Sequence, residues 1–309
     1  MEKIYGLNKL IRKATLIGLV VNILPIAALA GAGVATGIIL SNFFSYETVD
    51  YGNLTIEDYE PNKEALMKKY KATNPDKYFS SFKPEELANI AINKVGEHQY
   101  VHSVGIGTVT AVMNVKQSIR SYLVKNNNNY FFENISHSQF VSVQKRFYQD
   151  ESKVDLYLGD YVNEEKANWK DSVKESLSLS NFEEKWGRTF SRASIFIISD
   201  KTVISGSTNK QSDGNYVITL DLDPTTSVLR YVKQMVATSD LADPPKFNSM
   251  KIDITVDKDL NLLKTYTYEN YDVKSFGLTS KGTKANLEET FHYDEVVELP
   301  DLQTDCIYH

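Results

Sequence analysis

Three hydrophobic patterns follow one another along the chain. Residues 14–40 form an apolar run without a charged side chain. Later segments alternate apolar and polar positions with a period of two, and the stretches between some of them repeat near 3.6 residues. These patterns predict one membrane-spanning helix followed by a domain with many strands and few helices.

The apolar run is long enough to cross a bilayer as a transmembrane helix. At ~1.5 Å per residue it reaches about 40 Å, and a hydrocarbon core is ~30 Å thick. Residues 1–13 hold four basic side chains, whereas the residues just after the run are acidic. The positive-inside rule therefore predicts a cytoplasmic basic tail and an extracytoplasmic C-terminal part of a single-pass cell-membrane protein.

A cleaved signal peptide is the alternative interpretation of the same segment. Residues 14–26 would be its hydrophobic region and Ala28-Leu29-Ala30 its cleavage site. Cleavage there would leave the apolar stretch GAGVATGIIL at the new N-terminus. That outcome favours an uncleaved signal-anchor.

The remainder of the chain predicts a stalk, one domain and a tail. Residues 41–80 are polar and tyrosine-rich, which is typical of a membrane-proximal stalk, with a short helix over 61–70. Residues 81–300 form the predicted extracytoplasmic domain, and residues 301–309 a tail. The first helix of the domain is expected at 84–95, with proline at its first position and a glycine after its end.

Period-two alternation predicts most strands of this domain. The expected strands are 99–113, 117–125, 130–136, 140–149, 153–158, 215–221, 250–256, 262–272 and 286–293. Residues 194–199 and 202–205 are predicted to pair as a hairpin, followed by a polar loop over 206–214. Asp223-Pro224 is predicted to open another helix. The fold class is therefore α+β: one curved antiparallel sheet wrapped around two or three helices.

Composition narrows the partners of this domain. The net charge is −6, and the N-terminal tail is basic, so the remainder is more acidic still. An acidic domain has no electrostatic attraction for nucleic acid. The single cysteine, Cys306, excludes an intrachain disulfide, which suits a Gram-positive-type bacterial envelope better than a eukaryotic secretory route.

Candidate metal and catalytic groups do not form a recognisable motif. His98 and His102 are four residues apart, but in a strand this spacing separates them by about 13 Å. Asp253, Asp257 and Asp259 lack the glycine and the closing glutamate of a calcium loop, and a hairpin turn explains them better. No nucleophile elbow, P-loop or zinc motif occurs, so we expect no metal, no cofactor and no enzymatic activity.

Two adjoining segments carry a resemblance to a known group of proteins. NYVITLDLDPTTSVLRYVKQM and FNSMKIDITVDKDLNLLKTYTYENYDV combine a strand, a helix opened by Asp-Pro, and a two-stranded hairpin. With the preceding helix, this order resembles the LolA and LppX/LprG group of extracytoplasmic lipid-binding proteins over about residues 84–295. In that group a half-barrel wraps around helices and encloses an acyl-chain cavity. Unlike its members, which are lipoproteins or soluble carriers, this chain has no lipobox cysteine.

The resemblance implies a lipid or other apolar ligand in the concave face of the sheet. The expected ligand-binding residues are the apolar alternating positions Tyr216, Ile218, Leu220, Leu222, Ile252 and Ile254. Two other functions remain open from the sequence. The domain is alternatively an interaction or sensory module that binds an envelope protein without a ligand, and a hydrolase built from spatially convergent residues is the third interpretation.

Overall fold

The computed structural model describes residues 47–111, 115–138, 142–239, 243–275, 278–293 and 295–300. The chain divides into two compact units, residues 1–46 with 276–279 and residues 47–275 with 280–309. All elements below belong to the second unit, apart from the first two residues of the last strand. The predicted transmembrane helix, the basic tail and the C-terminal tail with Cys306 lie outside the described residues. In the described part of the chain, no helix is long and apolar enough to span a membrane.

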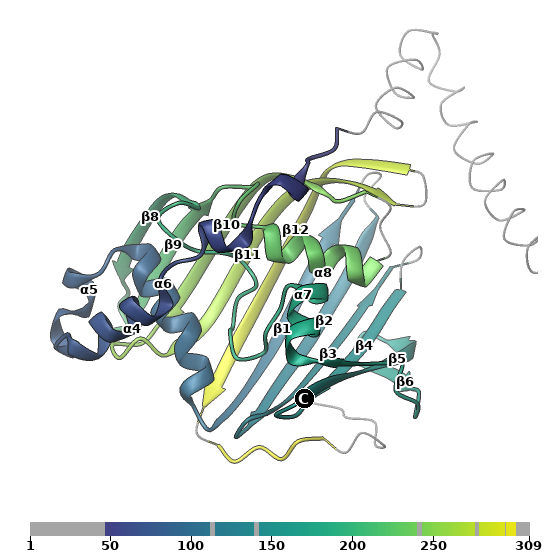
Figure 1. Ribbon diagram of the computed structural model, residues 1–309, viewed down its shortest axis with the longest axis horizontal. Coiled ribbons are helices and arrows are strands. Elements are labelled where there is room, and N and C mark those ends of the chain that lie inside the picture. Colours follow the sequence, from purple (N-terminus) through teal and green to yellow (C-terminus); the bar gives the residue numbers. More distant parts are fainter. Residues whose placement is uncertain are drawn as a thin grey trace, which may run out of the picture. The chain divides into compact units, whose positions relative to one another are not determined.

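The second unit is built on a 12-stranded antiparallel sheet, which confirms the α+β antiparallel prediction (Figure 1). Along the sheet the order is β6-β5-β4-β3-β2-β1-β12-β11-β10-β9-β8, and β7 pairs with β5. Most neighbours are therefore consecutive in sequence, and the pairing of β1 with β12 joins the two halves. The strands are β1 (Tyr100–Thr110), β2 (Lys116–Asn126), β3 (Asn129–His137), β4 (Ser142–Gln149), β5 (Lys153–Asn163), β6 (Lys166–Trp169), β7 (Glu175–Ser178), β8 (Val203–Lys210), β9 (Tyr216–Leu222), β10 (Lys246–Val256), β11 (Leu262–Ser275) and β12 (Leu278–Tyr293).

The longer helices lie on one face of this sheet (Figure 1). The α-helices are α3 (Ile56–Tyr59), α4 (Lys63–Ala72), α5 (Tyr78–Ser81), α6 (Pro84–Lys94), α7 (Leu179–Trp186) and α8 (Leu229–Ser239), with 3₁₀ turns at Tyr51–Asn53, Pro75–Lys77 and Val95–Glu97. Their buried side chains form two hydrophobic cores. The larger core joins α6 to β9 and β10, and the smaller joins α7 to β3 and β4.

Helix α6 follows from its sequence as predicted. Pro84 occupies the first turn, and the Glu86 carboxylate accepts the backbone N–H of Lys83 at 2.9 Å, which satisfies a donor that the helix leaves unpaired. Leu87, Ile90 and Ala91 recur at helical spacing and are fully buried.

The predicted hairpin over 194–199 and 202–205 is wrong at its first strand. Residues 194–199 have no strand partner, although Ile197 and Ile198 are fully buried. The N–H of Ile197 instead donates to the carbonyl of Ser227, and the carbonyl of Ile198 accepts the Asn89 side chain. The segment is apolar because it is buried beneath other elements, and its backbone bonds to a turn and to a side chain.

The predicted polar loop over 206–214 is also wrong in part. Residues 206–210 continue β8, which pairs with β9 at the edge of the sheet. Most β8 side chains are exposed, and residues 206–210 are glycine or polar, so no apolar position marks this part of the strand in the sequence. Its pairing with the strongly patterned β9 decides its conformation.

Residues 47–80 of the predicted stalk form short helices in the structure. Leu66 and Met67 of α4 and Tyr78 of α5 are buried in the larger core. The Tyr51 hydroxyl donates to the carbonyl of Pro245 at 2.9 Å. This segment therefore packs on the sheet that follows it in the chain.

Candidate functional site

A cavity of about 250 Å³ lies between the helix-bearing face of the sheet and a cover made by α7, α8 and the loop over 187–202. Side chains from β1, β2, β3, β4, β10, β11 and β12 form its floor. Strand periodicity explains which ones reach it. On β3, Phe132, Asn134 and Ser136 border the cavity, whereas the alternate residues point to the other face.

One wall of the cavity is aromatic. Its members come from β3, β4, α7 and the loop after α7, and they are Phe132, Phe147, Phe182, Trp186 and Phe190. The ring of Phe147 packs edge-on against Trp186 at 5.1 Å and against Phe182 at 5.6 Å between centroids. Edge-to-face geometry of this kind stabilises ring pairs beyond their burial.

Helix α7 presents its aromatic side chains to the cavity through its own local sequence. Ser178 caps the helix by accepting the N–H of Asn181, and Gly187 ends it in the left-handed conformation at φ +63°. Phe182 and Trp186 are four residues apart and therefore share one helical face. That face packs on the sheet.

Two buried carboxyl groups on the central strands also line the cavity. Glu269 of β11 accepts the Tyr231 hydroxyl of α8 at 3.1 Å, and Glu289 of β12 accepts the Ser103 hydroxyl of β1 at 2.6 Å. Burial away from water raises the pKa of Glu269 to about 7 and raises that of Glu289 as well. The cavity therefore borders carboxyl groups that hold a proton more tightly than exposed glutamates.

A guanidinium group faces the same cavity from the cover. Arg188 lies over the ring of Phe132 at 4.2 Å and over Phe190 at 5.5 Å. Burial lowers the pKa of Arg188, against the favourable influence of Glu289. Arginine nevertheless stays protonated in proteins, so Arg188 adds a positive charge to the lining of the cavity.

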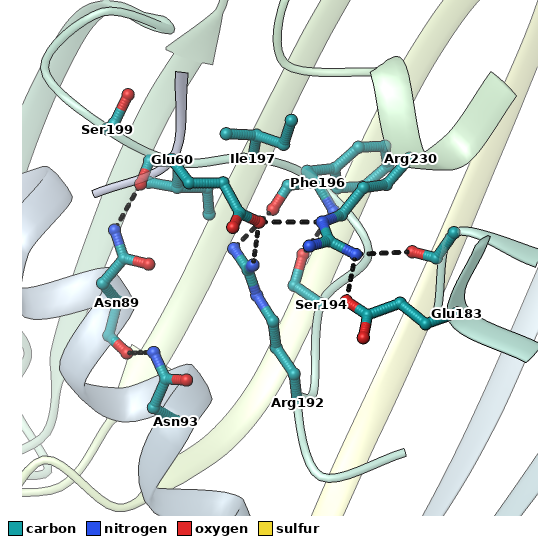
Figure 2. A network of polar contacts seen from close by, with 12 residues as sticks. Glu60, Asn89, Asn93, Glu183, Arg192, Ser194, Phe196, Ile197, Ser199 and Arg230 are labelled. Carbon is teal, nitrogen blue, oxygen red and sulfur yellow. Dashed lines mark hydrogen bonds and ion pairs between the residues drawn. The ribbon is translucent and has the colours of Figure 1, made fainter. Parts of the chain in front are cut away.

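The loop that covers the cavity is held by a network of ion pairs (Figure 2). Glu60 points toward two guanidinium groups and accepts Arg230 Nε at 2.8 Å and Arg192 Nη1 at 3.4 Å. Arg230 of α8 also donates to Glu183 of α7 at 2.7 Å, and Arg192 donates to the carbonyl of Phe196 at 2.9 Å. The network thus ties α7, α8 and the loop to the segment that precedes α4.

The predicted ligand-binding residues lie mostly beside the cavity, under α6. Ile218, Leu220, Leu222 and Ile254 are fully buried in the larger core. Tyr216 is half-buried and stacks on Phe79 at 3.4 Å between centroids. Of the predicted set, Ile252 borders the cavity. The six residues share one face of the sheet with the cavity floor, and whether any of them binds a ligand stays a prediction.

Sequence reasoning did not single out the aromatic wall, Arg188 or the two buried glutamates. A signal for the wall was present, because Phe182 and Trp186 repeat at helical spacing just before Arg188. The glutamates also gave a signal, since Glu269 and Glu289 stand at inward positions of alternating strands. Which inward positions border a cavity depends on the cover, and this is set by segments distant in sequence.

The candidate metal groups do not converge in the described part of the chain, where no three metal-binding side chains cluster. His102 pairs across the sheet with His292, and their rings stack at 4.6 Å. Asp257 accepts the backbone N–H groups of Asp259 and Asn261, as expected for a turn.

No protein-family model and no curated protein sequence matches the chain. Among solved structures, the chain is similar to a LolA superfamily protein from Nitrosomonas europaea, with 10% identity over 70% of this chain and 96% of that one and a TM-score of 0.28. It is also similar to an N-terminal dehydratase from the difficidin assembly line, with 9% identity over 69% of this chain and 83% of that one and a TM-score of 0.14. The first of these structures is from the superfamily that the sequence resembles. At these TM-scores neither likeness carries an argument about function, which rests on the cavity.

Proposed function

We propose that this chain is a single-pass envelope protein whose extracytoplasmic domain binds a lipid or another apolar ligand in the cavity under α7 and α8. Residues 14–40 are its membrane anchor in this proposal, with residues 1–13 in the cytoplasm. The sheet curves around the helices as a half-barrel, as in the group that the sequence resembles. One observation carries the proposal: a cavity of about 250 Å³ with a wall of five aromatic side chains.

Transfer of hydrocarbon from water supplies the binding energy. Each buried CH₂ contributes about 0.8 kcal/mol, so a chain of several methylenes binds without any catalytic group. The cavity volume is slightly below the ~300–1,000 Å³ of typical ligand sites. A single hydrocarbon chain is therefore a better match than a bulky multi-chain lipid.

The polar groups at the cavity favour binding over catalysis. Glu269 and Glu289 are already engaged by Tyr231 and Ser103. None of the described residues that border the cavity is a histidine, the commonest general base, or a cysteine, a common nucleophile. We therefore propose that the domain holds its ligand without transforming it.

Mass spectrometry of an organic extract from the purified full-length protein tests this function. The decisive comparison uses two tryptophan substitutions on α8. Gln234 borders the cavity and is half-buried, whereas the adjacent Lys233 is exposed on the other side of the helix. Gln234→Trp should fill the cavity and reduce the bound ligand, and Lys233→Trp should not.

Co-purified ligand at equal amounts in both variants would contradict the proposed site. A folded parent protein that carries no ligand and takes up no added amphiphile would contradict the function itself. In that case, binding to an envelope protein becomes the better interpretation, and a pull-down from membranes would follow.

A further inference from the structure

Two side chains that line the cavity indicate the kind of ligand it takes. Building on the proposed binding of an apolar ligand, we propose that the cavity selects an amphiphile with an anionic head group, which binds to Arg188 and to the indole N–H of Trp186. The hydrocarbon chain then lies along the aromatic wall. The head group is a carboxylate or a phosphate, because both match the planar fork of a guanidinium.

Arg188 differs from the other arginines that the structure describes. Each of the others pairs with a glutamate: Arg120 with Glu165, Arg146 with Glu133, and Arg192 and Arg230 with Glu60. Within the described residues, Arg188 has neither an ion pair within 4 Å nor a hydrogen bond, and its contacts are the rings of Phe132 and Phe190. Glu289 raises the pKa of Arg188 electrostatically, but its carboxyl forms its hydrogen bond with the Ser103 hydroxyl.

A guanidinium in this position is suited to receive an anion. Burying a charge without a partner is costly, and a carboxylate or phosphate would compensate the cost with charge-assisted hydrogen bonds. The guanidinium carbon of Arg188 lies over the Phe132 ring at 4.2 Å, and no described residue accepts a hydrogen bond from its N–H groups.

Trp186 provides a second, independent sign of a missing acceptor. Its side chain borders the same cavity and is 4% exposed, yet its Nε1–H has no hydrogen-bond partner within the described residues. Buried indole N–H groups usually find an acceptor. Arg188 is half-buried and Trp186 is buried, they lie two residues apart in sequence, and both border one cavity. Neither donor has an acceptor among the described residues, which indicates a ligand that accepts hydrogen bonds.

Two other groups around the cavity reduce or offset its negative charge. Burial raises the pKa of Glu269 to about 7, so this carboxyl is largely neutral at mildly acidic pH, and burial also raises the pKa of Glu289. Lys145 borders the cavity as well and adds positive charge, with its ammonium bonded to the carbonyls of Ala237 and Thr238 at the end of α8.

A head-group series on the full-length protein tests this proposal. The probes are dodecanoate, dodecyl phosphate, dodecanol and dodecyltrimethylammonium, measured by calorimetry below their micelle-forming concentrations, with acetate and inorganic phosphate as head groups without a chain. We expect at least one anionic amphiphile to bind about tenfold or more tightly than dodecanol, because a hydrogen bond to a charged group is worth about 1.5–3 kcal/mol. Acetate and inorganic phosphate should bind far more weakly than the anionic amphiphiles and dodecanol. The two anionic probes distinguish a fatty acid from a phospholipid-type head.

Arg188→Met keeps the apolar packing and removes the charge. It should abolish the preference for the anionic probes over dodecanol. Arg120→Met is the matched control, since Arg120 also lies over an aromatic ring but pairs with Glu165 and does not border the cavity. Trp186→Phe should reduce the same preference by a smaller factor.

Each outcome separates this proposal from the one it rests on. Equal binding of dodecanol and both anionic probes would overturn the anionic selectivity and keep the apolar site. Tighter binding of dodecyltrimethylammonium would assign recognition to the glutamates. No binding of any chain would refute the apolar function itself. Should Arg188→Met fail to fold, the head-group series on the parent protein still decides.

Discussion

The buried carboxyl of Glu269 makes the stability of this domain depend on pH in a predictable way. Burial raises its pKa from the ordinary 4.5 to about 7. Below pH 4.5 the group is protonated in both the folded and the unfolded chain. Between pH 4.5 and 7 the unfolded chain releases this proton and the folded chain keeps it, so the free energy of unfolding falls as the pH rises.

The size of this loss follows from the pKa difference. One pKa unit corresponds to 1.36 kcal/mol, so the difference between 4.5 and about 7 costs the folded state about 3 kcal/mol once the pH exceeds 7. Glu269→Gln removes the ionisable group and keeps an oxygen that accepts the Tyr231 hydroxyl. We expect the variant to match the parent within about 1 kcal/mol at pH 4 and to exceed it by about 3 kcal/mol at pH 8.

Urea denaturation followed by circular dichroism at pH 4, 6 and 8 measures this difference. Glu184→Gln on the exposed side of α7 is the control and should show no pH-dependent gain. A Glu269→Gln effect of equal size at every pH would refute the reasoning, because the carboxyl would then not be protonated by burial. A decrease in stability of the variant at pH 8 would refute it as well.

Two further predictions concern the cover of the cavity. Gly187→Ala should destabilise the domain by about 2 kcal/mol or more in urea denaturation, because φ is +63° and a Cβ would lie 2.2 Å from the carbonyl oxygen of Arg230. Gly282→Ala is the control, since its φ is +65° but the space around it is open, and it should cost about 1 kcal/mol. Equal losses in the two variants would contradict the close approach of α7 to α8. Glu60→Gln should cost about 1–2 kcal/mol, since charge-assisted bonds to two arginines are lost at a partly exposed site. A double-mutant cycle with Arg192→Met measures the coupling, and a value near zero would show that the ion pair does not hold the loop.

Elements with a strong local pattern could be predicted from the sequence. Helix α6 has its proline, its acidic first turn and its apolar stripe, and the structure places it at Pro84–Lys94. Strand β9 alternates cleanly, and the structure gives Tyr216–Leu222. The turn at Asp257 joins β10 to β11 as its residues indicate. In each case the residues that specify the element are adjacent in the chain.

Other elements were decided by contacts with distant segments. The helix predicted to open at Asp223-Pro224 begins at Leu229, because Asp223 caps a turn there through the N–H groups of Thr225 and Thr226. Residues 206–210 of β8 hold no apolar side chain, and their pairing with β9 makes them part of the strand. The apolar run over 194–199 is buried without a strand partner, because a side chain of α6 and a turn before α8 satisfy its backbone.

By itself, the sequence determined the apolar segment over 14–40, the alternation of an antiparallel sheet and the face of that sheet that is buried. The apolar segment is recognised by its length, and the sheet and its buried face by a period of two. Both signals lie in neighbouring residues. Only the tertiary structure decided which part of that face is closed over by helices and which part borders a cavity. The cavity joins Arg188 to Glu289 and Trp186 to Phe147, pairs that are far apart in the chain. No local pattern encodes such pairs, because they are brought together by strand register and by the packing of α7 and α8.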